Sequence, residues 1–252
     1  MTVRPPRLAL VTGAGSSTGI GYATAELLGR NGYRVAVAAT GPRIHERAAA
    51  LRAQGIEASG WVCDLTDPAA VALLTSSLGP VDVLVNNAGM AIEGIVDAQR
   101  PLVEMSLELW NQIVQRNLTT AFLATRACLP AMIAAGFGRI VNISSTTGAV
   151  AGVAGDSAYA AAKAAMLGMT RSLCLEVATA GITVNAVAPG WIATGSQTEA
   201  ERRAGIATPL GRSGRADEVA AAIVFLCSDA SSYVTGQLLV VDGGNSVVES
   251  RA

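Results

Sequence analysis

Tyr159 and Lys163 have residue types and a spacing that could move a proton. They lie four residues apart in the alanine-rich run SAYAAAKAAMLGM, and residues four apart lie on one face of a helix. A free phenol has a pKa of about 10, and an ammonium group beside it lowers that pKa by favouring the phenolate. We therefore expect Tyr159 to be able to exchange a proton with an alcohol or carbonyl oxygen of a substrate.

The strand that precedes this helix ends in two serines that could hold the substrate oxygen. The run IVNISS ends in Ser144 and Ser145, and a hydroxyl there can donate a hydrogen bond to a carbonyl oxygen. Both patterns also have a plainer reading. A Tyr-x-x-x-Lys pair also occurs where a tyrosine packs in the core next to a lysine on the surface. Two serines at a strand end are also typical of a turn.

The composition excludes several other kinds of chemistry. The chain has 252 residues, of which 51% are hydrophobic and 15% charged, and its formal net charge is −1 without a basic block. We therefore expect a folded globular protein that does not bind nucleic acid electrostatically. The single histidine, His45, lies in GPRIHERAA, which predicts a solvated first helical turn. Neither a Ser-His-Asp triad nor a multi-histidine metal site is expected, and no metal ligand is assigned.

The cysteines and the apolar segments indicate a cytoplasmic protein. The four cysteines are far apart and show no CxxC spacing, which is typical of reduced, buried thiols. The apolar run near the N-terminus is too short for a signal peptide. Every stretch of about 20 apolar residues contains a charge or a helix breaker, so no membrane span is expected.

Short apolar runs alternate with alanine-rich helical stretches along the chain. Several runs are apolar almost throughout, which is typical of parallel strands covered on both faces. The alternation predicts a doubly wound α/β fold of the Rossmann type, with a mostly parallel seven-stranded sheet and helices on both faces. The predicted strands are 8–12, 33–39, 57–62, 81–86, 138–143, 182–187 and 237–242, and the predicted helices are 20–31, 43–54, 68–78, 104–135, 157–179 and 215–228.

No linker, repeat or low-complexity tract divides the chain, so residues 1–252 are predicted to form one domain. Two loop-like segments, 88–103 and 189–214, interrupt the alternation. The second is rich in glycine, threonine and serine and follows a strand. Because ligands of open α/β sheets bind beyond the carboxyl ends of the strands, we expect 189–214 to be a substrate loop or lid.

The first predicted strand runs into TGAGSSTGIG, residues 12–21, and then into a helix. Small residues in such a turn let backbone N–H groups approach a pyrophosphate at the helix N-terminus, although tight turns also need glycine for steric reasons. The place of the turn between the first strand and the first helix favours a dinucleotide site. The residues of this loop that are predicted to bind the cofactor are Gly13, Gly15, Ser17, Thr18, Gly19 and Ile20.

Two further loops follow later strands at the same edge of the predicted sheet. Asp64 and Leu65 lie in CDLTD, and Asn87, Ala88 and Gly89 lie in NNAG. Asp64 could accept a hydrogen bond from an adenine amino group, and NNAG could hold the backbone close to a ribose. Each motif alone could be an Asx turn or a strand-end turn, but their common edge favours a cofactor site.

The end of the second strand bears on the choice between NAD and NADP. An acidic residue there would bind the ribose 2′-hydroxyl and repel a 2′-phosphate, whereas this chain reads VAVAATGPR. Thr40 offers a hydroxyl and Arg43 a guanidinium, which suit a phosphate. We therefore favour NADP(H), with NAD(H) as the alternative. Arg43 could also be a solvated helix residue.

Together these motifs resemble those of the short-chain dehydrogenase/reductase family, classical type, over almost the whole chain. They are specific as a set and weak singly. The matching motifs are loop 12–21, Asp64, NNAG at 86–89, Asn117 in VQRNLTTAF, Ser145 in NISS, Tyr159 with Lys163, Pro189-Gly190, and VTGQLLVVDGG near the C-terminus. Within the family, the sequence as a whole resembles those of 3-oxoacyl-carrier-protein reductases.

The resemblance implies a role for each matching residue. Tyr159 is the implied acid/base, and Lys163 tunes it and binds the nicotinamide ribose. Ser145 is implied to hold the substrate oxygen, and Asn117 to support a proton-relay water beside Lys163, although Asn117 alone would read as an ordinary polar helix residue. The residues implied to lie near the nicotinamide after the sixth strand are Pro189, Gly190, Ile192 and Thr194, the last of which could instead cap a helix.

Two features depart from the family pattern. The usual loop is T-G-x-x-x-G-x-G, and here Thr12 and Gly13 come two residues too early. Either the loop is longer or Gly15 replaces the first glycine. Ser145 also precedes Tyr159 by one residue more than in many relatives, which leaves Ser144 as a weaker alternative.

The residues expected to line the substrate pocket are mostly apolar or small; they are 91–95, 146–153, Trp191 and 195–207. Such a pocket suits an apolar or aromatic ketone or secondary alcohol. The first hypothesis is therefore an NAD(P)(H)-dependent alcohol dehydrogenase or carbonyl reductase. The alternative, a 3-oxoacyl-carrier-protein reductase, would need exposed basic residues near the site mouth. A non-catalytic dinucleotide-binding sensor is a second alternative, because a fold alone does not imply chemistry.

The predicted helices 104–135 and 157–179 are long and rich in alanine and leucine. Helices of this kind pair across two-fold axes in relatives, and the C-terminal tail could add a second contact. We expect a homotetramer, with a dimer as the alternative. The plainer reading is that these helix faces pack only on their own sheet.

Overall fold

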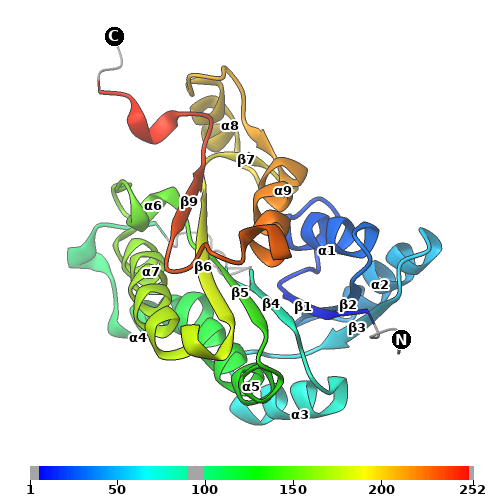
Figure 1. The fold of residues 1–252 in the computed structure, drawn as a ribbon. Coiled ribbons are helices and arrows are strands. Elements are labelled where there is room, and N and C mark those ends of the chain that lie inside the picture. Colours follow the sequence, from blue (N-terminus) through cyan, green and yellow to red (C-terminus); the bar gives the residue numbers. More distant parts are fainter. Residues whose placement is uncertain (1–5, 90–98, 250–252) are drawn as a thin grey trace.

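The computed structural model describes residues 6–89 and 99–249. Seven parallel strands form one sheet in the order β3-β2-β1-β4-β5-β6-β9 (Figure 1), which confirms the predicted sheet. The strands are β1 (Leu8–Thr12), β2 (Arg34–Ala39), β3 (Ala58–Val62), β4 (Val83–Asn86), β5 (Gly138–Ile143), β6 (Ile182–Pro189) and β9 (Leu238–Val241).

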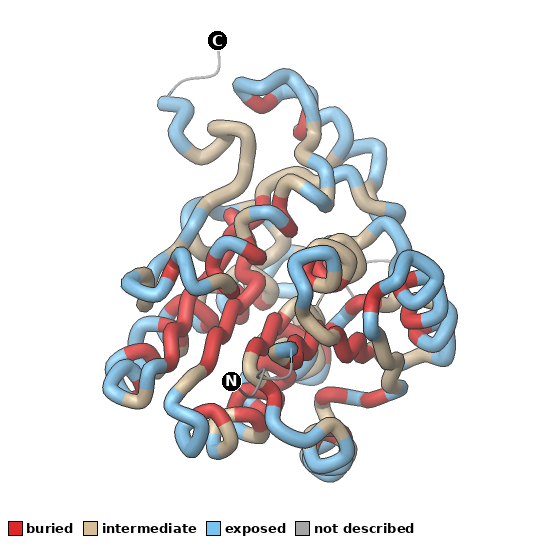
Figure 2. Tube along the Cα trace, turned by 45° about the vertical axis from the view of Figure 1, so that its right-hand side comes forward, coloured by how far each residue is buried: buried red, intermediate tan, exposed pale blue. Residues whose placement is uncertain are grey.

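The central strands are apolar because both of their faces are covered. Every residue of β1, β5 and β6 is buried, and Figure 2 shows this buried centre in red. The strand order reverses between β1 and β4, which are neighbours in the sheet but not in the sequence. A crevice for a ligand is therefore expected where the carboxyl ends of these two strands diverge.

Helices cover both faces of the sheet (Figure 1). One layer consists of α1 (Ile20–Arg30), α2 (Arg43–Ala53) and α9 (Ala216–Cys227). The other consists of α3 (Pro68–Leu78), α5 (Thr120–Ala135) and α7 (Ser157–Val177), with α4 (Leu107–Val114) packed on α7. Each layer buries a separate apolar core against the strands, so the doubly wound arrangement is as predicted.

The predicted helix 104–135 is divided in the structure. Residues Leu102–Glu104 form a 3₁₀ turn, and α4 starts after Ser106, whose hydroxyl accepts a hydrogen bond from the Leu109 N–H. A π-helical segment, Gln115–Thr119, separates α4 from α5. The predicted helix 157–179 ends at Val177 and continues as a 3₁₀ turn. The remaining predicted helices and strands agree with the structure to within two residues at each end.

The segment predicted as a lid, 189–214, is more ordered than a loop. It contains β7 (Ile192–Ala193) and α8 (Glu199–Ile206), and β7 pairs with β8 (Gly214–Arg215). This short ladder ties the two ends of the segment together. The part that stands away from the sheet is therefore 194–213, which we call the lid segment.

One helical stretch, Leu107–Ala135, is long and apolar enough to cross a membrane by length and composition alone. It is interrupted by the π-helical segment and carries Arg116, Arg126 and Pro130. Its residues Leu123, Cys128 and Met132 belong to the core that packs against the sheet. We therefore interpret the stretch as helices of the α/β fold.

Candidate active site

Tyr159 and Lys163 lie in the first two turns of α7, and the structure confirms that they share one face. The Nζ atom of Lys163 is 5.6 Å from the centroid of the Tyr159 ring. Lys163 is the only lysine of the chain and is 2% exposed. Its Nζ donates a hydrogen bond of 2.8 Å to the backbone carbonyl of Ile143, at the end of β5. Tyr159 is partly buried against a small apolar cluster that includes Leu109 and Ile113.

The protonation of this pair differs from the expectation. Burial raises the pKa of Tyr159, an effect that interaction with the Ser145 hydroxyl opposes and that Asp156 and Glu201 strengthen. Burial also lowers the pKa of Lys163, to about 8. The expectation that Lys163 lowers the pKa of Tyr159 is therefore wrong for the cofactor-free protein. The reason is desolvation, which disfavours the charged form of both groups. The phenol is protonated at neutral pH.

The two serines at the end of β5 have different surroundings. The Ser144 hydroxyl is 3% exposed and donates a hydrogen bond of 2.8 Å to the backbone carbonyl of Lys163. Ser145 is partly exposed, accepts a hydrogen bond of 3.1 Å from the Thr147 N–H, and interacts with the Tyr159 hydroxyl. The Ser144 hydroxyl is thus occupied by a structural bond, whereas the Ser145 hydroxyl lies next to that of Tyr159.

Asn117 lies in the π-helical segment and is 1% exposed. Its Nδ2 donates to the Ile113 carbonyl at 3.0 Å, but its Oδ1 is buried without a hydrogen-bond partner among the described residues. A Cβ atom on Gly89 would lie 2.7 Å from this oxygen. A buried oxygen without a donor is costly, so the position fits a water or a ligand hydroxyl that donates to it.

Thr12 and Gly13, at the start of the glycine loop, pack directly against the NNAG motif. The Thr12 hydroxyl accepts hydrogen bonds of 3.0 Å from the N–H groups of Asn87 and Ala88. Gly13 has a φ of +69°, and a Cβ there would lie 2.7 Å from the Ala88 Cα. Gly15 does not replace Gly13. The loop is instead longer, with an exposed turn at 16–18.

The NNAG motif holds this loop in place. Nδ2 of Asn87 donates hydrogen bonds of 3.0 Å to the carbonyls of both Thr12 and Gly13. A Cβ on Gly21 would lie 2.5 Å from that Nδ2, so the start of α1 must be glycine to approach so closely. The loops after β1 and β4 therefore form a closely packed, glycine-rich cradle next to the N-terminus of α1. Such a cradle fits the pyrophosphate of a dinucleotide.

Residues after β6 return to the same crevice. Pro189 ends β6, and the Gly190 N–H donates a hydrogen bond of 3.0 Å to the Val241 carbonyl. Ile192 is half-buried in β7, and the hydroxyls of Thr194 and Ser196 are 3.1 Å apart. Thr194 does not cap a helix. That position is taken by Thr198, which forms a capping box with Glu201 at the start of α8.

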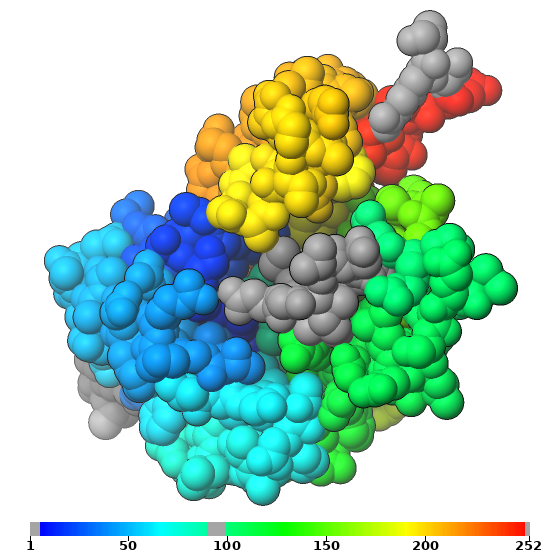
Figure 3. Space-filling view, turned by 180° about the vertical axis from the view of Figure 1, so that it is seen from behind, coloured from blue at the N-terminus to red at the C-terminus, as the bar shows by residue number. Residues whose placement is uncertain are grey.

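The glycine loop and the lid segment touch, a contact that the sequence did not predict. The Gly195 N–H donates a hydrogen bond of 2.9 Å to the Thr18 hydroxyl, across 177 positions of sequence. Figure 3 shows the two segments, blue and yellow, meeting on one face of the molecule.

Comparison with known proteins identifies the family. Residues 13–246 match the family described as enoyl-(acyl carrier protein) reductase. The chain is 41% identical to the 3-oxoacyl-acyl-carrier-protein reductase FabG of Salmonella typhimurium over 251 residues, which cover 96% of this chain and 98% of the relative. The chain belongs to the short-chain dehydrogenase/reductase family. Other members named FabG, from Escherichia coli and Pseudomonas aeruginosa, are 41% and 42% identical.

Two further members of the family differ from these in the name of their substrate. The cis-4-hydroxycyclohexanecarboxylate dehydrogenase of Sinomonas cyclohexanicum is 43% identical over 96% of this chain and 97% of the relative. Among solved structures, a variant of actinorhodin polyketide ketoreductase with NADPH is 38% identical with a TM-score of 0.87, covering 98% of this chain and all of that one. The named relatives thus favour the 3-oxoacyl alternative over the first hypothesis of a general carbonyl reductase.

The far end of the family's crevice lies beyond β2 and β3. Oδ1 of Asp64 accepts hydrogen bonds from the N–H and hydroxyl of Thr66 at 2.9 and 2.7 Å, which lower the pKa of Asp64. The neighbouring Leu65 is buried. Beyond β2, Thr40 is exposed, and a Cβ on Gly41 would meet no atom within 4 Å. The space beside the first turn of α2, which begins at Arg43, is therefore open.

His45 is exposed in the first turn of α2, as expected for a solvated helical turn. Among the described residues, no group of histidine, cysteine or acidic side chains is arranged to hold a metal ion.

Besides burial, two acidic residues, Asp156 and Glu201, raise the pKa of Tyr159 through their charge. Asp156, just before α7, accepts a hydrogen bond of 3.0 Å from Gln99, and burial raises the pKa of Asp156. Of the predicted walls, 146–153 contains the short helix α6 (Thr146–Ala149), and Trp191 is half-buried. Residues 91–95 lie outside the described part of the chain.

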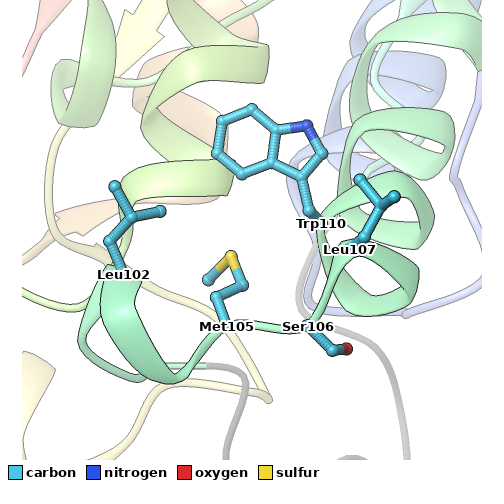
Figure 4. A pocket seen from close by; sticks show the side chains of 5 residues that line it. All are labelled: Leu102, Met105, Ser106, Leu107 and Trp110. Carbon is cyan, nitrogen blue, oxygen red and sulfur yellow. The ribbon is translucent and has the colours of Figure 1, made fainter.

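An apolar hollow lies next to the small apolar cluster of Leu109 and Ile113 that packs on Tyr159. It has a volume of about 270 Å³ and is lined by Leu102, Met105, Ser106, Leu107 and Trp110 (Figure 4). Met105 and Trp110 also pack on the cluster that contains Tyr159. The hollow was not predicted, because it forms where the 3₁₀ turn, the residues after it and the start of α4 meet, and the sequence predicted one continuous helix there.

Proposed function

We propose that this protein is an NADP(H)-dependent reductase that converts a 3-oxoacyl thioester to the corresponding 3-hydroxyacyl thioester. The observation that carries the proposal is the pairing of Ser145 with the protonated, partly buried hydroxyl of Tyr159 beside the glycine cradle. In this proposal the catalytic residues are Asn117, Ser145, Tyr159 and Lys163.

The mechanism follows from the two hydroxyls. Ser145 donates a hydrogen bond to the ketone oxygen and orients it, and Tyr159 transfers its proton to that oxygen as the ketone becomes an alcohol. Because the pKa of Tyr159 is raised, the phenol carries the proton that reduction consumes. A bound nicotinamide cofactor supplies the hydride. The orphaned Oδ1 of Asn117 accepts from a water that returns a proton to Tyr159 by way of Lys163.

Cofactor binding is assigned to the loops at the carboxyl edge of the sheet. The cradle takes the pyrophosphate, and the open space at Gly41 with Thr40 and Arg43 takes a 2′-phosphate. This chain has no acidic side chain at the end of β2 to repel that phosphate, which favours NADP(H) over NAD(H). The proposed cofactor-binding residues are Gly13, Gly15, Ser17, Thr18, Gly19, Ile20, Thr40, Arg43, Asp64, Leu65, Asn87, Ala88, Gly89, Tyr159, Lys163, Pro189, Gly190, Ile192 and Thr194.

A second candidate function is the oxidation of a secondary alcohol on a free small molecule. The dehydrogenase of Sinomonas cyclohexanicum, 43% identical, supports it. So does the charge of the lid segment's helix, in which Glu199 and Glu201 balance Arg202 and Arg203. An active-site entrance without excess positive charge has little electrostatic attraction for an acidic carrier protein.

The two functions are separated by a direct assay. The loss of reduced-nicotinamide absorbance is followed with NADPH or NADH and acetoacetyl-CoA, a soluble 3-oxoacyl thioester. The reverse reaction is followed with NADP⁺ or NAD⁺ and cyclohexanol-type alcohols. We expect the highest kcat/KM with acetoacetyl-CoA and NADPH. Turnover of the alcohols alone would contradict the proposal and support the second candidate.

Tyr159→Phe decides between an enzyme and a dinucleotide-binding sensor. We expect the variant to lose turnover by a factor on the order of 10³ or more. Its intrinsic tryptophan fluorescence should still be quenched when NADPH binds. Tyr233→Phe, which removes a fully exposed hydroxyl, is the matched control and should keep full turnover. Equal turnover of the Tyr159→Phe variant and the parent would overturn the mechanism.

We further propose that the 1–252 domain forms a homotetramer in the cytoplasm. Large apolar side chains are exposed on two regions: one is formed by α4, α5 and α7, with Leu107, Phe122, Ile133 and Leu175, and the other surrounds α9 and β9, with Phe225, Tyr233 and Leu239. Two such regions on one chain suit two different two-fold contacts. The four free, buried cysteines suit a reducing compartment. Light scattering of the purified protein tests the tetramer against a dimer.

A further inference from the structure

The hydrogen bond between Thr18 and Gly195 connects the two rims of the crevice. Thr18 lies in the exposed turn of the lengthened glycine loop, and Gly195 lies at the start of the lid segment. The loop holds one side of the dinucleotide site, and residues 192–194 reach the other side. A bond between them spans the place where a dinucleotide would enter and leave.

The contact is close enough to constrain both residues. The Thr18 hydroxyl accepts the Gly195 N–H at 2.9 Å, and the same hydroxyl lies 3.4 Å from the Ser16 hydroxyl. A Cβ atom on Gly195 would lie 2.8 Å from the Thr18 Oγ1, and apart from the two chain neighbours of Gly195 no other atom of the described residues lies within 4 Å of it. Gly195 also does not have a left-handed backbone. The space at Gly195 is therefore limited by Thr18 and by nothing else described.

We propose that Thr18 is a positioning residue that latches the lid segment over the dinucleotide site. Its hydroxyl holds the start of the lid segment closed, and opening of the segment breaks the bond. The extra length of the glycine loop is what brings a side chain this far across the crevice. The identity of the molecule held beneath the latch rests on the proposed function; the latch itself does not.

The latch can be tested without cofactor by limited proteolysis. Arg202 and Arg203 are exposed on α8, and trypsin cuts after them when the lid segment detaches. Thr18→Val removes the acceptor at constant shape, and we expect the initial rate of these cuts to rise roughly threefold to tenfold, the population shift that one hydrogen bond supports. Thr18→Ser keeps the acceptor, and Ser17→Ala changes the adjacent exposed residue. Both should be cleaved at the parent's rate.

A double-mutant cycle shows whether the two residues act on each other. Gly195→Ala should raise the cleavage rate in the parent, because its Cβ displaces the Thr18 hydroxyl. In a Thr18→Ala background the obstructing oxygen is absent, so adding Gly195→Ala should change the rate by less than about twofold. Independent, multiplying effects of the two substitutions would overturn the latch, as would a parent-like rate for Thr18→Val.

NADPH release gives a second reading. In stopped-flow fluorescence we expect NADPH to dissociate roughly threefold to tenfold faster from Thr18→Val than from the parent or Thr18→Ser. The KM for NADPH should rise in Thr18→Val and stay at the parent's value in Thr18→Ser. If the protein bound no dinucleotide, the proposed function would be wrong. The cofactor-free proteolysis would still show whether Thr18 holds the lid segment. Parent-like release together with parent-like cleavage would reject the latch alone.

Discussion

The ammonium group of Lys163 donates a hydrogen bond of 2.8 Å to the backbone carbonyl of Ile143. The Ser144 hydroxyl donates one of equal length in return, to the backbone carbonyl of Lys163. These two bonds join the end of β5 to the first turns of α7. Because Ser145 follows on β5 and Tyr159 lies on α7, the same two bonds set the distance between the proposed catalytic hydroxyls.

Lys163→Met should change how stability depends on pH. The pKa of Lys163 is lowered from 10.5 to about 8 by burial, so between these values the unfolded chain binds more protons than the folded one. Stability therefore rises with pH through this window, and below about pH 8 the parent carries a penalty of roughly 3 kcal/mol. The variant lacks the penalty. We expect its free energy of unfolding, relative to the parent, to decline between about pH 7 and pH 10 in urea titrations.

Ser145→Ala should lower kcat for ketone reduction by a factor on the order of 10² or more, because the ketone oxygen loses a donor. It should also raise the pKa of Tyr159 further, since Ser145 is the group that lowers it. Reduction needs the protonated phenol, so the alkaline limb of the pH–rate profile moves to higher pH. Ser76→Ala, which removes an exposed hydroxyl from α3, is the control and should leave kcat and that limb in place.

Asp229→Asn should weaken the fold and leave activity intact. At the amino edge of the sheet, Asp229 lies 2.8 Å from Arg7 and 3.7 Å from Arg139, which is 4% exposed. Both guanidinium groups stack on Phe137, at 3.9 and 4.4 Å from the ring centroid. The substitution leaves two cations close together, and we expect a loss of roughly 1–2 kcal/mol in chemical denaturation, smaller at high salt.

A matched control for this change is Asp217→Asn. Asp217 pairs with Arg215 at 2.9 Å, but both side chains are about two-thirds exposed. Exposed pairs contribute little, so this loss should be below about 0.5 kcal/mol. Equal losses for the two variants would show that the buried guanidinium of Arg139 does not depend on Asp229.

Thr40→Asp should shift cofactor preference toward NAD(H). The new carboxylate would lie at the end of β2, beside the open space at Gly41 and the first turn of α2. There it repels a 2′-phosphate and can accept a bond from a 2′-hydroxyl. We expect the Kd of NADPH to rise at least about tenfold, or 1.4 kcal/mol, and that of NADH to fall or stay unchanged. A parallel rise for both cofactors in fluorescence titration would contradict the assignment.

The sheet and its helices could be predicted because burial dictates composition locally. Strands such as β5 and β6 are buried throughout and therefore read as continuous apolar runs. The positions of Tyr159 and Lys163 on one face also follow from helical spacing alone. Helix ends were less predictable, because the π-helical segment at Asn117 depends on packing between α4, α5 and α7.

Other parts of the site depend on contacts between distant residues. The raised pKa of Tyr159 could not be read from its spacing to Lys163, because it depends on how deeply α7 is buried. The structure was needed to see that Gly13, and not Gly15, is the glycine that closely approaches Ala88. The hydrogen bond from Gly195 to Thr18 joins segments that are 177 positions apart in the sequence. The open turn SST at 16–18 between two glycines was the only sign in the sequence that the loop was long enough to reach across.

Lys163 is the only lysine in the chain, and it is buried. On the described surface, the permanently charged basic side chains are therefore all arginines. Reagents that acylate primary amines find no target among these surface side chains. Apart from the chain's own terminal amine, Lys163 carries the one primary amine of the sequence, so the extent of acylation at Lys163 would report on access to the proposed catalytic centre.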